Sequence, residues 1–237
     1  MRLTVKPYAR TLTWVSIFGI AMGALEAAVV IYLRRLYFPN GFQFPLWAVE
    51  NDVLIVELWR EAATIVMLAA VGALAGRKRS ERFAWFVYVF ALWDLVYYLV
   101  LKLSIDWPDS LLTWDILFLL PVPWIAPVLA PCMVAVTMIA FSMLAIRHSD
   151  SSDVYLTPRE RWLIVLGSLV VIFSFTIDWI QFEGPRIMEN IAAHRRFDYR
   201  VGSFIPQSFP WWIFAVGESM FIAAFLQLRA RLGKLRS

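Results

Sequence analysis

Six long apolar segments constrain this 237-residue chain more than any other feature of its sequence. Each is long enough to cross a hydrocarbon core about 30 Å thick, because an α-helix rises about 1.5 Å per residue. Hydrophobic residues make up 61% of the chain and charged residues only 17%, unlike the roughly 45–50% and 25% of soluble domains. The sequence therefore predicts an all-α, polytopic membrane helix bundle, with helices near residues 12–33, 53–75, 83–105, 124–146, 162–182 and 209–228.

Lysine and arginine are distributed unequally between the two sides of this bundle. One side holds 14 of them, and the other holds seven: Arg34, Arg35, Lys102, Arg186, Arg195, Arg196 and Arg200. The positive-inside rule then predicts that both termini lie in the cytoplasm and that loops 34–52, 103–123 and 183–208 face outward. We expect residues 1–237 to form a single integral membrane domain.

The composition also narrows the cofactors and partners. A single cysteine excludes an internal disulfide framework, and two histidines leave little for a haem or zinc site. Carboxylate ligands would suit a hard divalent cation such as Mg²⁺ or Ca²⁺, and that option stays open. The net charge of +4 is explained by the basic loops, so we expect a lipid bilayer and no nucleic acid as partner.

Eight charged residues fall inside the predicted spans, where each costs about 2.5–3.5 kcal/mol on insertion scales. Counted from the outer end of each helix, the acids lie within about 15 Å of the outer interface and form a layer. The inner half contains nothing comparable. The acids are Glu26, Glu57, Glu61, Asp94, Asp178 and Glu218, and the bases are Arg60 and Lys102.

The spacing of these residues places several of them on common helix faces. Glu57, Arg60 and Glu61 follow i, i+3, i+4 spacing, so the arginine can bridge carboxylates of its own helix or of a neighbour. A second stripe on the third helix comprises Asp94, Tyr97, Tyr98 and Lys102. When each group is considered alone, a structural ion pair explains it as well as a functional site does.

Six acids against two bases leave an excess that ion pairing cannot neutralise. Some carboxyl groups must therefore be protonated, bound to a cation or wetted by water, and an outward-opening polar pocket explains all of these. The candidate catalytic residues are Glu26, Asp94 and Glu218. The candidate pocket residues are Glu57, Arg60, Glu61, Tyr97, Tyr98, Lys102, Asp115, Asp178 and Trp211.

Four prolines interrupt the apolar stretch between residues 114 and 131. We expect Ser110–Leu120 to form a short half-helix that Pro121 and Pro123 break, so that a proline-broken segment precedes the fourth helix. Irregular backbone is not tolerated against lipid, so the break should be buried or should line the pocket, with Asp115 at its rim. A buried kink that only shapes packing is the alternative.

Two further patterns concern surfaces of the bundle. Residues 185–196 predict a short interfacial helix on the outer membrane surface, because Pro185 suits a first helical position and apolar residues fall on one face. Gly19, Gly23 and Ala27 form a small-residue stripe that lets a neighbouring helix approach closely. Packing within the chain is the simpler explanation, and contact with a membrane-protein partner or a second copy is the alternative.

The stretch "ERFAWFVYVFALWDLVYYLVLKLSIDWPDSLLTWDILFLLPVPWIAPVLAP" (81–131) resembles a family of uncharacterised multi-pass bacterial membrane proteins. The segments "EAAVVIYLRRLYFP" (26–39) and "REAATIVMLAAV" (60–71) fit the same pattern. The resemblance implies a bacterial inner-membrane location and brings no activity with it.

Three functions fit these patterns. The first is an intramembrane enzyme in which Glu26, Asp94 and Glu218 exchange protons with a lipid-like or isoprenoid-like substrate between aromatic walls. The second is a non-catalytic subunit or assembly factor of a membrane complex. The third is a proton- or cation-coupled transporter of small solutes, although only one broken helix is predicted where such transporters usually have a pair.

Overall fold

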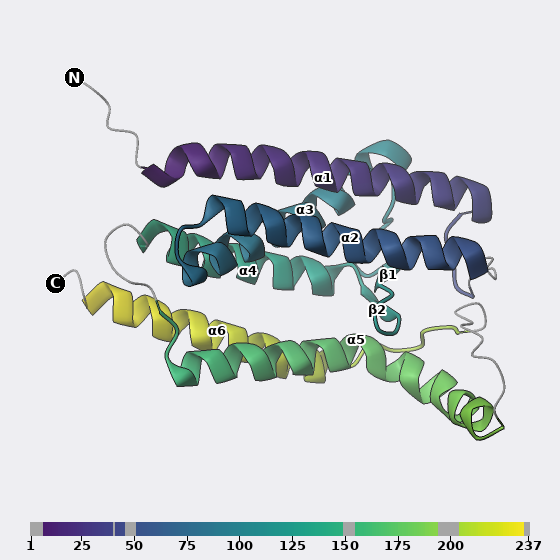
Figure 1. The fold of residues 1–237 in the computed structure, drawn as a ribbon. Helices are drawn as coiled ribbons and strands as arrows, with labels where there is room; N and C mark the ends of the chain where they lie inside the picture. Colours follow the sequence, from purple (N-terminus) through teal and green to yellow (C-terminus); the bar gives the residue numbers. More distant parts are fainter. Residues whose placement is uncertain (1–6, 40, 46–50, 149–154, 194–203, 235–237) are drawn as a thin grey trace.

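The computed structural model describes residues 7–39, 41–45, 51–148, 155–193 and 204–234. Within these residues it contains six α-helices and one two-stranded antiparallel sheet (Figure 1). The elements in chain order are α1 (Pro7–Tyr37), α2 (Asn51–Ala75), α3 (Arg79–Ile105), β1 (Trp114–Phe118), β2 (Trp124–Pro127), α4 (Leu129–His148), α5 (Pro158–Ala192) and α6 (Trp211–Lys234).

Five of the helices, α1, α3, α4, α5 and α6, are long and apolar enough to cross a membrane. The helix α2 is outside this set, and its N-terminal half carries Glu57, Arg60 and Glu61. The start of α1 and the end of α6 lie at one end of the bundle, which we name the terminal end; the opposite end is the distal end (Figure 1). The structure confirms a helical protein with membrane-like helices, while a count of six spans stays a prediction.

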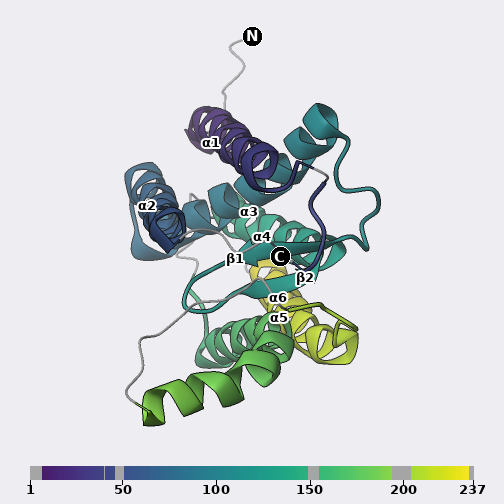
Figure 2. The same ribbon diagram turned by 90° about the vertical axis from the view of Figure 1, so that its right-hand side faces the viewer.

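The helices form two groups with the β-hairpin between them (Figure 2). In the first group α3 packs against α1, α2 and α4, and in the second α5 packs against α6. Contacts of β2 with α5 and α4, and of α4 with α6, join the two groups. Trp85 and Val89 centre one buried cluster within the first group, and Phe175 and Phe214 centre another between the hairpin, α5 and α6.

The small-residue stripe of α1 packs against α3 of the same chain. A Cβ atom at Gly23 would lie 2.8 Å from the carbonyl oxygen of Trp93 and 2.9 Å from the Cβ of Val96. Ala27, one turn further on, is fully buried. The close approach of the two helices therefore accounts for the stripe without a second protein.

A methyl group at Gly23 should force α1 away from α3. We expect Gly23→Ala to lower the free energy of unfolding by about 1–3 kcal/mol, the usual cost of overpacking. Gly233 is the matched control, because a Cβ atom there meets nothing within 4 Å. Gly233→Ala should be neutral or stabilise by up to about 1 kcal/mol through helix propensity. Reversible unfolding in mixed micelles measures both, and equal effects at the two sites would contradict the packing explanation.

The proline-rich stretch forms a β-hairpin, so the predicted half-helix over residues 110–120 is wrong. The strands pair antiparallel, with Trp114 opposite Pro127. Pro121 and Pro123 lie in the connection between the strands, where a missing N–H removes no bond from the strand pairing. Strand pairing takes residues 124–127 out of the predicted fourth helix, which begins only at residue 129.

The hairpin is packed against the helices, with β2 more buried than β1, and its two strands pair with each other. Ile125 and Ala126 of β2 are buried. The backbone N–H of Val128 donates to the Thr113 carbonyl at 3.0 Å, which continues the pairing beyond the strands. In a membrane protein this burial is what makes a non-helical segment tolerable.

The helix α5 continues through Pro185 to Ala192, so the separate interfacial helix predicted from residue 185 is instead the last part of α5. A proline inside a helix removes one backbone hydrogen bond and usually bends the helix. Figure 1 shows the last turns of α5 bending away from α6. The predicted interfacial residues 194–196 lie outside the described residues.

At the terminal end, a buried ion pair ties the start of α5 to the end of α6. Arg231 Nη2 lies 2.9 Å from Oε2 of Glu160, whose side chain is 2% exposed. Glu160 also accepts the backbone N–H of Thr157, and the Thr157 hydroxyl accepts the N–H of Glu160, so the two residues form a capping box. This contact accounts for one pair of charges outside the candidate site.

Candidate functional site

A small cavity lies between α1, α2, α3 and β1, in the part of the bundle near the hairpin. Its volume is about 60 Å³, which is room for a few water molecules. Apolar and aromatic walls are supplied by Val30, Trp93, Ile116, Leu117 and Phe118. Six residues predicted for the site line the cavity: Glu26, Arg60, Glu61, Asp94, Tyr97 and Tyr98.

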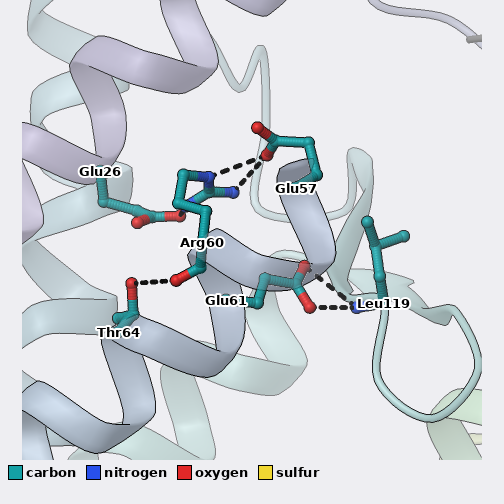
Figure 3. Close-up of polar contacts among 6 residues, drawn as sticks. All are labelled: Glu26, Glu57, Arg60, Glu61, Thr64 and Leu119. Carbon is teal, nitrogen blue, oxygen red and sulfur yellow. Dashed lines mark hydrogen bonds and ion pairs between the residues drawn. The ribbon is translucent and has the colours of Figure 1, made fainter. Parts of the chain in front are cut away.

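Arg60 lies between two carboxylates, one from its own helix and one from a neighbour (Figure 3). Its Nε and Nη2 atoms donate to Oε2 of Glu57 at 2.8 and 2.6 Å, and its Nη1 atom donates to Oε1 of Glu26. The Thr64 hydroxyl, one turn further along α2, donates to the Arg60 carbonyl oxygen at 3.0 Å. The predicted spacing on α2 thus produces an ion-pair triad that joins α2 to α1.

Glu61 does not join the triad and contacts the hairpin instead. Both of its carboxylate oxygens accept the backbone N–H of Leu119, at 3.1 and 3.0 Å (Figure 3). Leu119 follows β1 directly, in the connection that carries Pro121 and Pro123. Glu61 therefore holds the end of β1, which forms one wall of the cavity, against α2.

Asp115 anchors the other end of β1. It accepts hydrogen bonds from Arg34 Nη2 and from the Tyr98 hydroxyl, both at 3.2 Å. The Arg34 guanidinium also lies over the rings of Trp107 and Phe42, at 3.5 and 4.4 Å from their centroids. Burial raises the pKa of Asp115 to about 6, although the facing guanidinium acts in the opposite direction.

Arg34 was not predicted as a site residue. It lies at the end of an apolar segment and was therefore counted among the positively charged residues of the outer loops. The structure includes it in the last turn of α1, where its side chain is buried. Its position seven residues after Ala27, which is close to two full helical turns and places it on the same helix face as the small-residue stripe, was the available signal. Leu119 contributes its backbone N–H, a group that every residue except proline has, so its role could not be predicted from the sequence.

Asp94 differs from every other carboxylate of the cavity. It is half-buried, and its carboxylate makes no hydrogen bond or ion pair with any residue that the structure describes. The hydroxyl of Tyr97, one turn further along α3, is likewise without a hydrogen bond among the described residues. Asp94 is therefore the carboxyl group that is free to exchange a proton with, or bind, whatever enters the cavity.

Four of the predicted site residues lie elsewhere. Glu218 of α6 is buried and bonds the hydroxyl of Thr137 on α4. Lys102 is paired with Asp106 at 2.6 Å at the exposed end of α3. Asp178 on α5 and Trp211 at the start of α6 do not line the cavity either. The acids predicted as a layer therefore do not share one pocket.

The charges around the cavity do not balance. Glu26, Glu61 and Asp94 line it together with a single guanidinium, that of Arg60. Arg60 also pairs with Glu57 outside the cavity, while Arg34 is matched by Asp115. Within the described residues, no three His, Cys, Asp or Glu side chains are grouped so that they could hold a metal ion. The acidic side chains that line the cavity therefore outnumber the cations that line it.

Comparisons with protein families, with curated proteins and with solved structures find no match to this chain.

Proposed function

We propose that this chain is a multi-pass protein of the bacterial cytoplasmic membrane, with six spans and both termini in the cytoplasm. The unequal distribution of lysine and arginine supports this orientation, and the alternating directions of the helices agree with it (Figure 1). In this orientation the cavity lies toward the outer leaflet. The helix α2 is the sixth span, and its charged residues are accommodated by the contacts of Arg60 and Glu61.

We further propose that the cavity is a catalytic site for acid–base chemistry on the polar group of a lipid-like substrate. The unpartnered Asp94 carboxylate is the observation that carries this proposal. An acid or base must be free to take up and release a proton, whereas Glu57 and Glu61 are already engaged. Asp94 is the proposed acid–base group, and Glu26 lies across the cavity as a fixed, ion-paired charge.

The size of the cavity restricts the part of the substrate that enters it. Pockets for whole drug-sized ligands measure about 300–1,000 Å³, so a cavity of about 60 Å³ takes only a small polar group. The apolar remainder would stay between α1 and α2, which both pack on α3 but make little contact with each other. Leu25 and Trp59, the sequence neighbours of Glu26 and Arg60, are 59% and 74% exposed and would face that lipid.

Asp94→Asn should strongly slow turnover without unfolding the protein. The test incubates purified protein in nanodiscs of a bacterial polar lipid extract and measures the change of each lipid class by mass spectrometry. We expect conversion of one lipid class to slow by about a hundredfold in the variant, the lower range for losing an acid–base group. Glu183→Gln is the control, because Glu183 is a buried carboxylate of α5 that does not line the cavity.

Unchanged lipid composition with the wild-type protein would refute the enzyme proposal. A proton-coupled transporter is the second candidate, since acidic side chains inside a membrane-embedded helix bundle commonly mark proton or ion pathways. Proton flux into vesicles that contain the protein, lost in Asp94→Asn and kept in Glu183→Gln, would support that candidate instead.

A further inference from the structure

The electrostatics of the cavity exclude anionic ligands and favour cationic ones. Glu26, Glu61 and Asp94 line the cavity with one guanidinium, that of Arg60, which is already paired with Glu26 and Glu57. An entering phosphate or carboxylate would therefore meet repulsion in a region poorly screened by water. The carboxylate that has no partner, Asp94, offers an acceptor and a negative charge at the same point. A ligand that brings a positive charge and hydrogen-bond donors would satisfy both.

The cavity also offers a set of acceptors that the protein does not use. Beside Asp94 these are the hydroxyl oxygen of Tyr97 and Oε2 of Glu26, whose other oxygen is bonded to Arg60. A primary ammonium group has three N–H donors and no acceptor, which matches three acceptors around a small space. Among the described residues no carboxylate grouping fits a metal ion instead.

Aromatic side chains complete the cavity walls. Trp93, Tyr97 and Tyr98 line it, and the Tyr97 and Tyr98 rings meet edge to face with centroids 4.9 Å apart. Aromatic faces attract ammonium groups through their quadrupole, and the attraction increases where water is excluded. The volume of about 60 Å³ accommodates an ammonium group with the adjoining carbon and leaves the rest of the molecule outside.

From these three features we infer that the cavity binds a primary ammonium group, carried by an aminophospholipid headgroup or by a free amine. The inference names the substrate class of the proposed enzyme and in that sense rests on the proposed function. Binding itself requires no turnover, so the two can be tested separately.

The binding test uses nanodiscs of phosphatidylethanolamine and phosphatidylglycerol, with native mass spectrometry to count the lipids that stay bound to the protein. We expect selective retention of phosphatidylethanolamine, weakened about tenfold or more in Asp94→Asn because a charged hydrogen-bond partner is lost. Tyr97→Phe removes only one acceptor and should weaken retention severalfold. It serves as a second variant if Asp94→Asn does not fold. Glu183→Gln should retain the lipid as the wild type does.

Soluble probes distinguish the source of the ammonium group. Ethanolamine that raises the unfolding temperature in phosphatidylglycerol nanodiscs would show that a free amine suffices; protection only by phosphatidylethanolamine would assign the lipid headgroup. Tetramethylammonium has no N–H donor and should protect least.

Equal retention of both lipids by wild type and Asp94→Asn, with no protection by ethanolamine, would overturn the inference. Amine binding without lipid turnover would refute only the proposed enzyme, and turnover of a lipid without an amine would refute only this inference.

Discussion

Replacing Arg60 by methionine should destabilise the protein by about 3–5 kcal/mol, the usual cost of removing one partner from a buried ion pair. Glu26 and Glu57 would each lose the guanidinium with which they pair, while their side chains are only 11% and 13% exposed. The variant also removes the hydrogen bond that joins α2 to α1, although both helices still pack on α3. The free energy of unfolding in mixed micelles measures the effect.

A compensating variant distinguishes uncompensated charge from a general loss of packing. Glu26→Gln and Glu57→Gln, added to Arg60→Met, should recover most of the lost stability, since no buried charge is left unpaired. Arg35→Met is the control, because Arg35 is an exposed arginine of α1 and should change stability by no more than about 0.5 kcal/mol. A loss below about 1 kcal/mol in Arg60→Met would show that the triad is solvated and contributes little.

The helices were predictable because apolar length is a local property of the sequence. The predicted segments match six observed helices, and the structure extends several of them past the apolar core, as at the end of α1, where Arg34 and Arg35 occupy the last turn. The hairpin was not predictable in the same way. Proline spacing indicates where a helix stops, whereas the pairing of Trp114 with Pro127 depends on two segments that meet only in the folded chain.

Those residues of the candidate site that share one helix face were predictable from their spacing in the sequence. Spacing on α2 and α3 placed Arg60 beside Glu57 and placed Asp94 one turn from Tyr97 and Tyr98, and all of these lie at or next to the cavity. The predicted depth in the membrane is similar for Glu26 and Glu218, so depth could not show which of the two lines the cavity. That choice depends on which helices are neighbours, and α6 packs on α5 and α4 rather than on the α1–α3 face. Charge and depth identify candidates, and tertiary packing decides which of them meet.

Asp115 should make the stability of the protein fall as pH rises from about 4 to about 6. Burial raises the pKa of this carboxyl from its ordinary 3.8 to about 6, and Arg34 offsets only part of the effect. Between these two pKa values the folded state holds a proton that the unfolded state has released, so unfolding becomes easier as pH rises. A difference of about two pKa units corresponds to about 3 kcal/mol.

Asp115→Asn isolates this contribution, because the amide keeps the shape of the side chain and an acceptor for Tyr98 but does not titrate. We expect the variant to lack the decline, so that its stability relative to wild type increases between pH 4 and pH 6 and stays constant above. Asp106→Asn is the control: the hydrogen bond from Lys102 lowers the pKa of the exposed Asp106, so its replacement should give a small change of opposite sign. Parallel profiles of wild type and Asp115→Asn would mean that water reaches Asp115 and that the hairpin does not bury its carboxyl group.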